Sequence, residues 1–326
     1  MLLRLCSRLP FFQTYRYLNK TTEISKRIDR FNGIHLNIIS YENNDLHNII
    51  QYINDIINDP PGFKAIWVTL KSEHCELVPA LCRPYPLGPG FKFHHAYNSE
   101  ATLVRWLGEG VSRLPDYASH QVGVAGVLTN SDTSKVLMVR EKGSPTFSGW
   151  KFPTGLLHAG EDIADAAVRE VYEECGIHTD FGGVISFRQQ HDFPGSFGIS
   201  DLLFTCRLQL PNGVSEPEIK TCSYEIADCK WMPISKLLSA NVHTIISTNE
   251  SNSFNHDNEI HITSFTQKII HLIMITNHHS IDLLSSELTP HRESSIIKGK
   301  FYDLFLPRSF NVHYRTYQKN VYLIIL

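Results

Sequence analysis

Three glutamates crowd one side of a helix that the sequence predicts over residues 162–175. The stretch GLLHAGEDIADAAVREVYEECGI, residues 155–177, places glutamates at positions 170, 173 and 174. At about 100° per residue, Glu173 lies about 60° to one side of Glu170, and Glu174 lies about 40° to the other. Like charges three or four residues apart destabilise a helix by about 0.2–0.5 kcal/mol per pair. A helix that keeps such a cluster therefore needs a positive charge beside it.

The rest of the stretch predicts how this helix is oriented and where it ends. An apolar stripe on another side is expected to face the core, and it consists of Ala164, Val168, Val171, Tyr172 and Cys175. Gly176 follows where a left-handed C-cap would end the helix. Arg169 lies two turns beyond Glu161, so we expect this pair to hold back the preceding loop, which Gly155 and Gly160 allow to bend sharply.

A divalent cation is the simplest counter-charge for three clustered carboxylates. All-oxygen ligation suits Mg²⁺ or Mn²⁺, with the remaining positions filled by water and substrate phosphates. We therefore expect Glu170, Glu173 and Glu174 to be metal ligands. The alternative is a solvated acidic face, which is the commoner reason for an E-x-x-E-E sequence.

The spacing around the helix decides between these two interpretations. Gly155, five residues, Glu161, seven residues and then REVYEECGI satisfy the pattern G-x5-E-x7-R-E-U-x-E-E-x-G-U. Seven fixed positions at about 7% usage each coincide by chance roughly once in 10⁸ windows. The stretch resembles the signature of the Nudix hydrolases, which cleave nucleoside diphosphates linked to another group.

Other segments resemble the motif 6 branch of that family, which includes plant ADP-ribose/NADH pyrophosphatases. These segments are YASHQVGVAG, WKFPTG, FRQQH, PGSFGISDL and WMPISKL, while FKFHHA and WLGEGVSRLP are similar to the small N-terminal domain of the branch. The likeness covers most of residues 30–240. Thr154 departs from the branch, which usually has the first glycine of a pair there, but this change removes no ligand.

The resemblance implies a fold and a chemistry. The fold is a Nudix α/β/α sandwich with a mixed sheet, preceded by a small α/β N-terminal domain, and the reaction is a metal-dependent attack of water on a diphosphate. Glu173, or a loop carboxylate such as Glu225, would deprotonate the water. Arg188 and His191 lie in a branch motif and either contact the substrate or have a structural role. The structural supports of the signature would be Gly155, Glu161, Arg169 and Gly176.

The substrate follows only from the resemblance, which favours ADP-ribose or NADH. Nothing in the signature contacts a base, and the walls of the pocket decide specificity. A cap or coenzyme A diphosphatase is the alternative within the enzyme class. The alternative of another class is a regulatory or interaction protein that keeps the fold with minimal turnover.

Four segments are expected along the chain. Before the first acid at position 23, residues 1–27 carry four dispersed basic residues (Arg4, Arg8, Arg16 and Lys20), which is typical of a mitochondrial transit peptide. The alternative is a basic tail on a cytoplasmic or nuclear protein. A small α/β domain is expected at 28–113, the Nudix domain at 114–240, and a polar insertion with a C-terminal extension at 241–326.

The sequence of the N-terminal domain indicates no catalytic or metal site of its own. Strands are expected at 33–40 and 64–70, with a helix between them. His94 and His95 are adjacent in a predicted strand, so their side chains should point to opposite faces rather than to one metal. The apolar stretches IIQYINDII and KAIWVTL exceed what so small a unit needs, so we expect a homodimer, with catalysis confined to residues 118–240.

Composition narrows the possible partners. A formal net charge of −3 argues against general nucleic-acid binding, which usually requires a basic surplus. Seven cysteines without a C-x-x-C pair fit a reducing compartment better than a disulfide scaffold. No run of about 20 apolar residues occurs, so no membrane-spanning helix is expected. The expected partner is a nucleotide-type small molecule.

Overall fold

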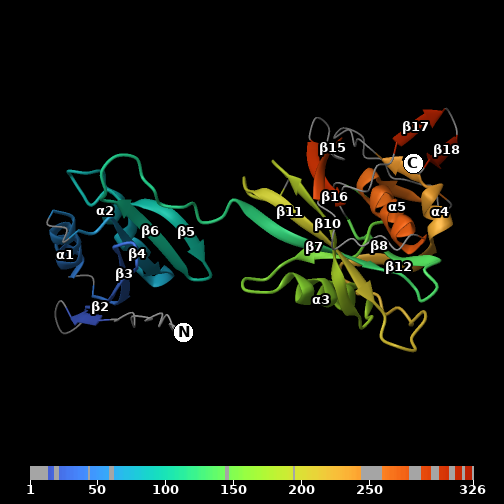
Figure 1. Ribbon diagram of the computed structural model, residues 1–326. Coiled ribbons are helices and arrows are strands. Elements are labelled where there is room, and N and C mark those ends of the chain that lie inside the picture. Colours follow the sequence, from blue (N-terminus) through green and yellow to red (C-terminus); the bar gives the residue numbers. More distant parts are fainter. Residues whose placement is uncertain are drawn as a thin grey trace, which may run out of the picture. The chain divides into compact units, whose positions relative to one another are not determined.

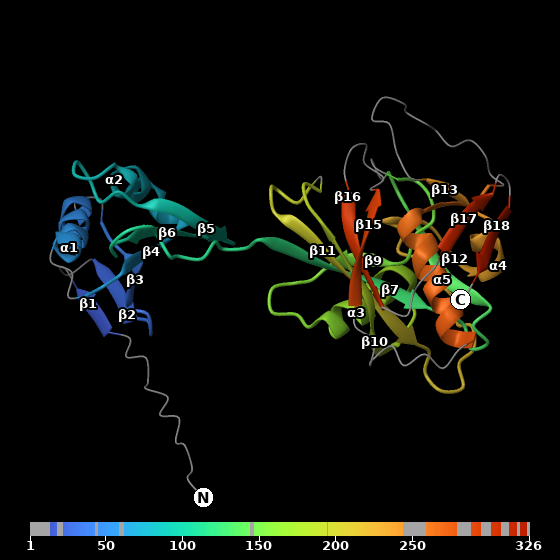
Figure 2. The ribbon, with the colours of Figure 1, turned by 45° about the horizontal axis from the view of Figure 1, so that its top comes forward.

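The chain forms two compact units in a computed structural model, Met1–Tyr117 and Ala118–Leu326, and each is described by itself (Figures 1 and 2). The structure describes residues 14–17, 22–42, 45–58, 62–143, 147–193, 195–243, 259–278, 288–294, 301–307, 313–317 and 320–324. No helix in these ranges is long and apolar enough to cross a membrane.

The first unit is built on a six-stranded sheet of order β1-β2-β3-β4-β6-β5. Its strands are β1 (Thr14–Tyr17), β2 (Glu23–Ile28), β3 (Gly33–Ser40), β4 (Ala65–Lys71), β5 (Lys92–Tyr97) and β6 (Glu100–Trp106). Helix α1 (Leu46–Asn58) connects the parallel pair β3 and β4, and all other pairs are antiparallel. The short helices η2 (Ser72–Leu77) and α2 (Val78–Cys82) follow β4.

The core of this unit joins α1 to one face of the sheet. Alternate residues of β3 and β4 point to that face, as the period of a strand requires. Helical spacing places three isoleucines of α1 against them. The buried set includes Ile34, Leu36, Ile38, Ile49, Ile53, Ile57, Ile66, Val68 and Leu70. The two apolar stretches from which a homodimer was predicted therefore pack largely inside the unit.

Two predictions for the first unit need correction. The leader was expected to end at residue 27, but β2 begins at Glu23 and pairs with β3; residues 1–13 and 18–21 lie outside the described part. His94 and His95 were expected on opposite faces, but a bulge in β5 between Phe93 and His95 breaks the alternation. The two Nδ1 atoms lie 2.7 Å apart.

The second unit is built on a mixed six-stranded sheet of order β15-β16-β10-β11-β7-β9, with a separate antiparallel pair β12-β8. The strands are β7 (His120–Leu128), β8 (Lys135–Glu141), β9 (Thr154–Leu156), β10 (Asp180–Gln190), β11 (Ser200–Gln209), β12 (Ile226–Pro233), β15 (Leu288–Ser294) and β16 (Phe301–Pro307). β11 and β7 pair in parallel, and the other pairs of this sheet are antiparallel. Two further pairs are β13 (Asn241–His243) with β14 (His261–Thr263), and β17 (His313–Tyr317) with β18 (Asn320–Ile324).

Helices cover both faces of the second unit's sheet (Figure 1). Helix α3 (Ile163–Cys175) packs on one face, where Val124 and Leu128 of β7 are buried. Helix α5 (Ser264–His278) packs on the other, against Ala125 and Val127, near the short helix α4 (Ile234–Leu238). Gly126 lets α3 approach closely, because a Cβ there would lie 2.5 Å from Val171 Cγ2. This is the α/β/α arrangement that the resemblance implied.

The C-terminal part differs from the expected extension. Residues 241–326 were predicted to be a polar insertion and an extension beyond the domain. Instead, β16 pairs with β10 and carries β15 into the central sheet. Leu304 and Leu306 of β16 are buried in the core beneath α5. Residues 244–258, which contain most of the Asn/Ser-rich stretch, lie outside the described part.

Candidate active site

Helix α3 begins one residue after the predicted start and ends at the predicted residue. Asp162 precedes it in an extended conformation, and Cys175 is its last residue. Gly176 adopts the left-handed conformation with φ 69°, and its N–H donates to the carbonyl of Tyr172 at 2.8 Å. The glycine therefore turns the chain away sharply and fixes the direction in which the last turn of the helix presents its carboxylates.

The buried face of α3 differs from the predicted apolar stripe. The buried residues are Ala166, Ala167, Glu170, Val171, Glu174 and Cys175. Tyr172 was assigned to the core but is 48% exposed. The two alanines are small enough to let the helix lie close to β7. Two of the three glutamates are consequently carried into the interior rather than left on a solvated face.

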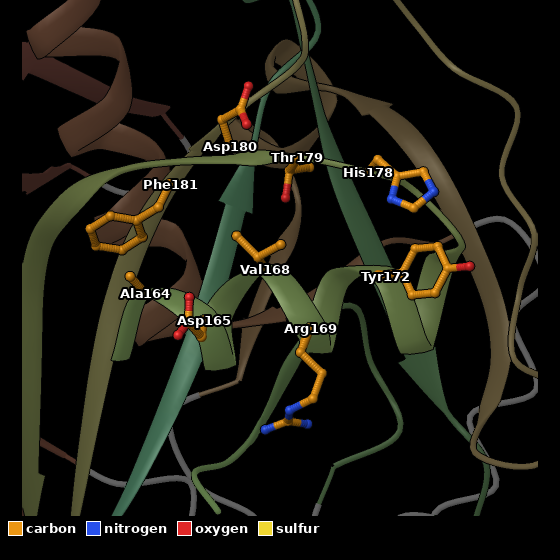
Figure 3. A pocket seen from close by; sticks show the side chains of 9 residues that line it. All are labelled: Ala164, Asp165, Val168, Arg169, Tyr172, His178, Thr179, Asp180 and Phe181. Atoms are coloured by element: carbon orange, nitrogen blue, oxygen red, sulfur yellow. The ribbon is translucent and has the colours of Figure 1, made fainter. Parts of the chain in front are cut away.

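A groove runs along the other side of α3, between the helix and the start of β10 (Figure 3). Its lining residues are Ala164, Asp165, Val168, Arg169, Tyr172, His178, Thr179, Asp180 and Phe181. Figure 3 shows that the guanidinium group of Arg169 points away from the groove, out of the opposite side of the helix. The groove is therefore separate from the region where the carboxylates gather.

Arg169 is the first counter-charge of the cluster. Its Nε and Nη2 donate to both oxygens of Glu161 at 2.7 and 2.8 Å. Its Nη1 donates to Glu170 at 2.7 Å and to Glu173 at 2.9 Å, and Nη2 also reaches the carbonyl of Leu156 at 3.1 Å. The hydrogen bonds from Arg169 lower the pKa of Glu161 to about 2. One guanidinium thus ties the loop to the helix and relieves much of the repulsion.

Gly155 is required by the position of Glu170. The glycine lies in β9 and pairs with Val124 of β7. A Cβ at this position would lie 2.0 Å from the carboxyl carbon of Glu170, so any other residue would displace this carboxylate. The first glycine of the signature therefore makes room for a carboxylate that α3 directs at the sheet.

Glu174 is the most deeply placed carboxylate. It is 4% exposed, and its Oε2 has no hydrogen-bond partner in the described part of the chain. Burial raises the pKa of Glu174 to about 8, against a weaker lowering by Lys151 and by the backbone N–H of Thr154. Burial also raises the pKa of Glu170, although Arg169 opposes the shift. Two buried carboxylates with an unused oxygen form an environment that a cation would stabilise.

The carboxylates of the three glutamates are suitable ligands for a divalent cation, but they do not converge on one point in this structure. Within the described residues, no three His, Cys, Asp or Glu side chains are close enough together to hold a metal ion as they stand. Arg169 forms hydrogen bonds with Glu170 and Glu173, while the positive charge that acts on Glu174 is that of Lys151. Binding of a cation would therefore require Arg169 to share these two carboxylates.

Two residues near Glu174 were missed by the sequence analysis. Lys151 donates from Nζ to the carboxylate of Glu141 and, at 2.6 Å, to the hydroxyl of Thr154. Both Lys151 and Glu141 act electrostatically on Glu174. Lys151 lies within WKFPTG, which was used only to identify the branch; no short-range pattern indicated that it would meet the end of β8.

The other predicted residues lie away from the cluster. Arg188 donates to Asp201 at 2.6 Å and lies over the ring of Phe265 in α5, so it is on the face of the sheet opposite α3. His191, just after β10, is exposed and shares a hydrogen bond of 2.7 Å with Ser200. Their roles as substrate contacts stay predictions.

Glu225, the alternative base, is exposed in the turn before β12. Its backbone carbonyl accepts a hydrogen bond from the N–H of Lys142 at 2.8 Å, which holds this turn next to the end of β8. In the part of the chain that the structure describes, no hydrogen bond or ion pair joins its carboxylate to the glutamates of α3.

The sequence is similar to those of known proteins. The family described as NUDIX domain matches residues 119–248, and the family described as Nudix hydrolase domain matches residues 24–107. The Xenopus laevis protein named nucleoside diphosphate-linked moiety X motif 6 is 44% identical over 224 residues, which cover 68% of this chain and 91% of that protein. The chain belongs to the Nudix hydrolase family.

Other relatives place this Nudix protein in the motif 6 branch. The human protein of the same name is 38% identical over 224 residues, or 68% of this chain, and the match spans 63% of the human protein's length. Nudix hydrolase 8 of Arabidopsis thaliana is 40% identical over 180 residues, covering 54% of this chain and 46% of the plant protein. Among solved structures, the MutT protein from Methanosarcina mazei is 17% identical, with a TM-score of 0.35, and the match covers 50% of this chain and 99% of that one.

The buried carboxyl of Glu174 predicts an unusual pH dependence of stability in cation-free protein. With a folded pKa of about 8 and an ordinary value of 4.5, folding takes up a proton between these pH values, so the wild type loses stability as pH rises through this window. Glu174→Gln mimics the protonated form and removes the loss. We expect the variant to be more stable by at least about 1 kcal/mol at pH 7.5 and equal to the wild type at pH 4.

Urea unfolding in the presence of EDTA at pH 4, 6 and 7.5 measures this difference. Glu218 is exposed, so Glu218→Gln is the matched control. The pH dependence of its stability should equal that of the wild type. Parallel pH profiles for the wild type and Glu174→Gln would show that the Glu174 carboxyl is ionised in the folded protein and would contradict the prediction.

Proposed function

We propose that the Nudix domain hydrolyses a nucleoside diphosphate linked to another group, with Mg²⁺ or Mn²⁺ held by Glu170, Glu173 and Glu174. One observation carries the proposal: Glu174 is buried with an unpartnered oxygen beside a second buried glutamate. A solvated acidic face would not have this burial. The names of the motif 6 relatives agree with a substrate of this class.

Each residue has a separate task in this proposal. The cation, when bound, neutralises the diphosphate and lowers the pKa of a water molecule. Glu170 and Glu174 hold it from the buried side, and Gly155 leaves the space that Glu170 needs. Glu173 is 54% exposed, and its proposed task is to accept the proton of the attacking water. Arg169 fixes the helix against the loop through Glu161.

Glu173 is the better of the two candidate bases. Glu173 and Glu170 accept hydrogen bonds from the same nitrogen of Arg169. The carboxylate of Glu173 therefore lies close to that of Glu170, which would hold the cation. Glu225 remains the alternative, since its turn is anchored at the end of β8. A base must come within hydrogen-bond reach of the water from which it takes the proton.

The proposed substrates are ADP-ribose and NADH, as in the plant members that the sequence resembles. Capped RNA and coenzyme A are the alternatives within the same reaction class. Turnover of all four compounds, measured with Mg²⁺ and with Mn²⁺, separates these possibilities. A kcat/KM for ADP-ribose or NADH well above those for the other compounds supports the assignment.

The first prediction for this function concerns the base. Glu173→Gln keeps a side chain of the same size but cannot accept a proton, so kcat should fall by at least roughly 100-fold. The change in unfolding free energy should stay below about 1 kcal/mol, because the pair with Arg169 is exposed. Steady-state kinetics and thermal unfolding measure the two quantities.

Asp165→Asn serves as the control for this experiment. Asp165 is an exposed acid of the same helix, on the groove side, and its loss should leave kcat unchanged. Wild-type turnover in Glu173→Gln would point to Glu225 as the base. If no substrate of the panel is turned over by the wild type, the rival of a regulatory or interaction protein with a Nudix fold is favoured.

We propose a mitochondrial location for the protein. Arg4, Arg8, Arg16 and Lys20, with no acid before Glu23, support this proposal. A fluorescent fusion of residues 1–30 should enter mitochondria, and replacing the three arginines with glutamate should keep it out. A diffuse cytosolic signal from the unmutated fusion would refute the proposal.

We propose that the protein is a homodimer through its N-terminal unit. β5 stands at the end of the sheet order, and its Phe93 and Tyr97 side chains are exposed, which is the kind of edge through which sheets associate. Light scattering on the full chain should give twice the monomer mass, and Phe93→Asp should reduce it to the monomer. A monomeric wild type would exclude this interface.

A further inference from the structure

Lys151 interacts with two carboxylates. It lies at an isolated bridge with Val139 of β8, where the two backbones exchange hydrogen bonds of 2.8 and 2.9 Å. This pairing directs its side chain to Glu141, the last residue of β8, with which it forms an ion pair. The charge of Lys151 also acts on the buried Glu174, of which it is the strongest stabilising neighbour.

Glu141 belongs to the same group of charges without being part of the Nudix signature. Its negative charge opposes the ionisation of Glu174, as that of Glu170 does, and it pairs with the same Lys151 whose charge favours that ionisation. Its side chain is 35% exposed, so it borders the interior rather than lying free in solution.

Two positively charged side chains, Arg169 and Lys151, contact different members of this group of carboxylates. Arg169 contacts Glu161, Glu170 and Glu173, all within the signature. Lys151 pairs with Glu141, and its positive charge favours the ionised form of Glu174. The Arg169 group is thus organised by α3 and its loop, and the Lys151 group by β8 and the segment between β8 and β9.

We propose that Glu141 is a fourth carboxylate of the cation site, and that Lys151 is a resident counter-charge with which a divalent cation competes. The inference rests on the proposed function, since it assumes that a cation binds beside Glu174. It adds one acidic and one basic residue that lie outside α3. Glu141 supplies negative charge from the strand side, opposite the glutamates of the helix.

Thr154 acquires a role in this arrangement. It stands where the branch usually has a glycine, and its hydroxyl accepts a hydrogen bond of 2.6 Å from Lys151. Its backbone N–H also donates to Glu174. Thr154 therefore holds the lysine close to Glu174, so the departure from the family pattern tightens the competition between the ammonium group and the cation.

The inference predicts effects of opposite sign for the two partners of one ion pair. Removing the charge of Glu141 takes a carboxylate from the site, so cation affinity should fall. Removing the charge of Lys151 leaves Glu141 and Glu174 without their cationic neighbour, so affinity should rise. A purely structural ion pair would give effects of the same sign, because either change would disturb the site equally.

The test is a titration of the full-length protein with Mn²⁺, in which electron paramagnetic resonance measures the free ion in the absence of substrate. For Glu141→Gln we expect Kd to increase on the order of tenfold, the lower range for loss of a group that supports a metal site. For Lys151→Met we expect Kd to decrease several-fold. Thr154→Val removes the hydroxyl that holds Lys151 without changing the charge, so it should also lower the Kd for Mn²⁺.

The chain provides a matched control pair. Lys135 and Glu216 form a half-exposed ion pair of 2.9 Å that joins β8 to the loop before β12. Lys135→Met and Glu216→Gln change the net charge as the test variants do, and both should leave the Kd for Mn²⁺ unchanged. A change as large as in the test variants would show that net charge alone is responsible and would overturn the inference.

The remaining outcomes separate this inference from the proposed function. If Glu174→Gln weakens Mn²⁺ binding but Glu141→Gln does not, the inference fails while the proposed function stands. If the wild type neither binds Mn²⁺ nor hydrolyses a diphosphate, the proposed function fails. Thermal unfolding of every variant identifies misfolding; if Lys151→Met does not fold, Thr154→Val carries the test, and unchanged or weaker binding in it overturns the inference.

Discussion

The fork of hydrogen bonds from Arg169 is the interaction on which the second unit's site depends. A single guanidinium fixes the loop through Glu161 and compensates two glutamates of the next turns. Arginine suits this task because its planar group offers several donors in fixed directions. Without Arg169, the loop would not be held against the helix, and the carboxylates of Glu161, Glu170 and Glu173 would have no fixed positions relative to one another. The carboxylate of Glu170 would then not be held in the space beside Gly155.

Close packing of α3 on the sheet buries a charged side chain, Glu174. Small residues, Gly126 in β7 and two alanines in α3, let the helix lie directly on the sheet. That approach carries Glu174 into the interior, where an ionised carboxyl is costly unless a cation accompanies it. The apolar packing that stabilises the unit therefore also creates the demand for positive charge that the proposed chemistry uses.

Local features of the site could be predicted from the sequence, and long-range features could not. The limits of α3, its Gly176 cap and the pair of Arg169 with Glu161 follow from spacings of a few residues. The buried face of the helix was predicted only in part: Val171 and Cys175 are buried as expected, but Tyr172 is exposed, and the burial of two alanines and two glutamates was not predicted. The bulge beside His95, and the meeting of Lys151 with Glu141, depend on which strands pair, and periodicity within one strand carries no such information.

The pairing of β16 with β10 has a consequence for biosynthesis. β10 is made early in the second unit, but one of its two neighbours, β16, leaves the ribosome only after α5. Until then, that side of β10 exposes unpaired backbone groups, which is the condition under which strands associate wrongly. The first unit has all its described strands complete before β7 is translated, so a nascent chain carries one finished unit and one open sheet for much of its synthesis.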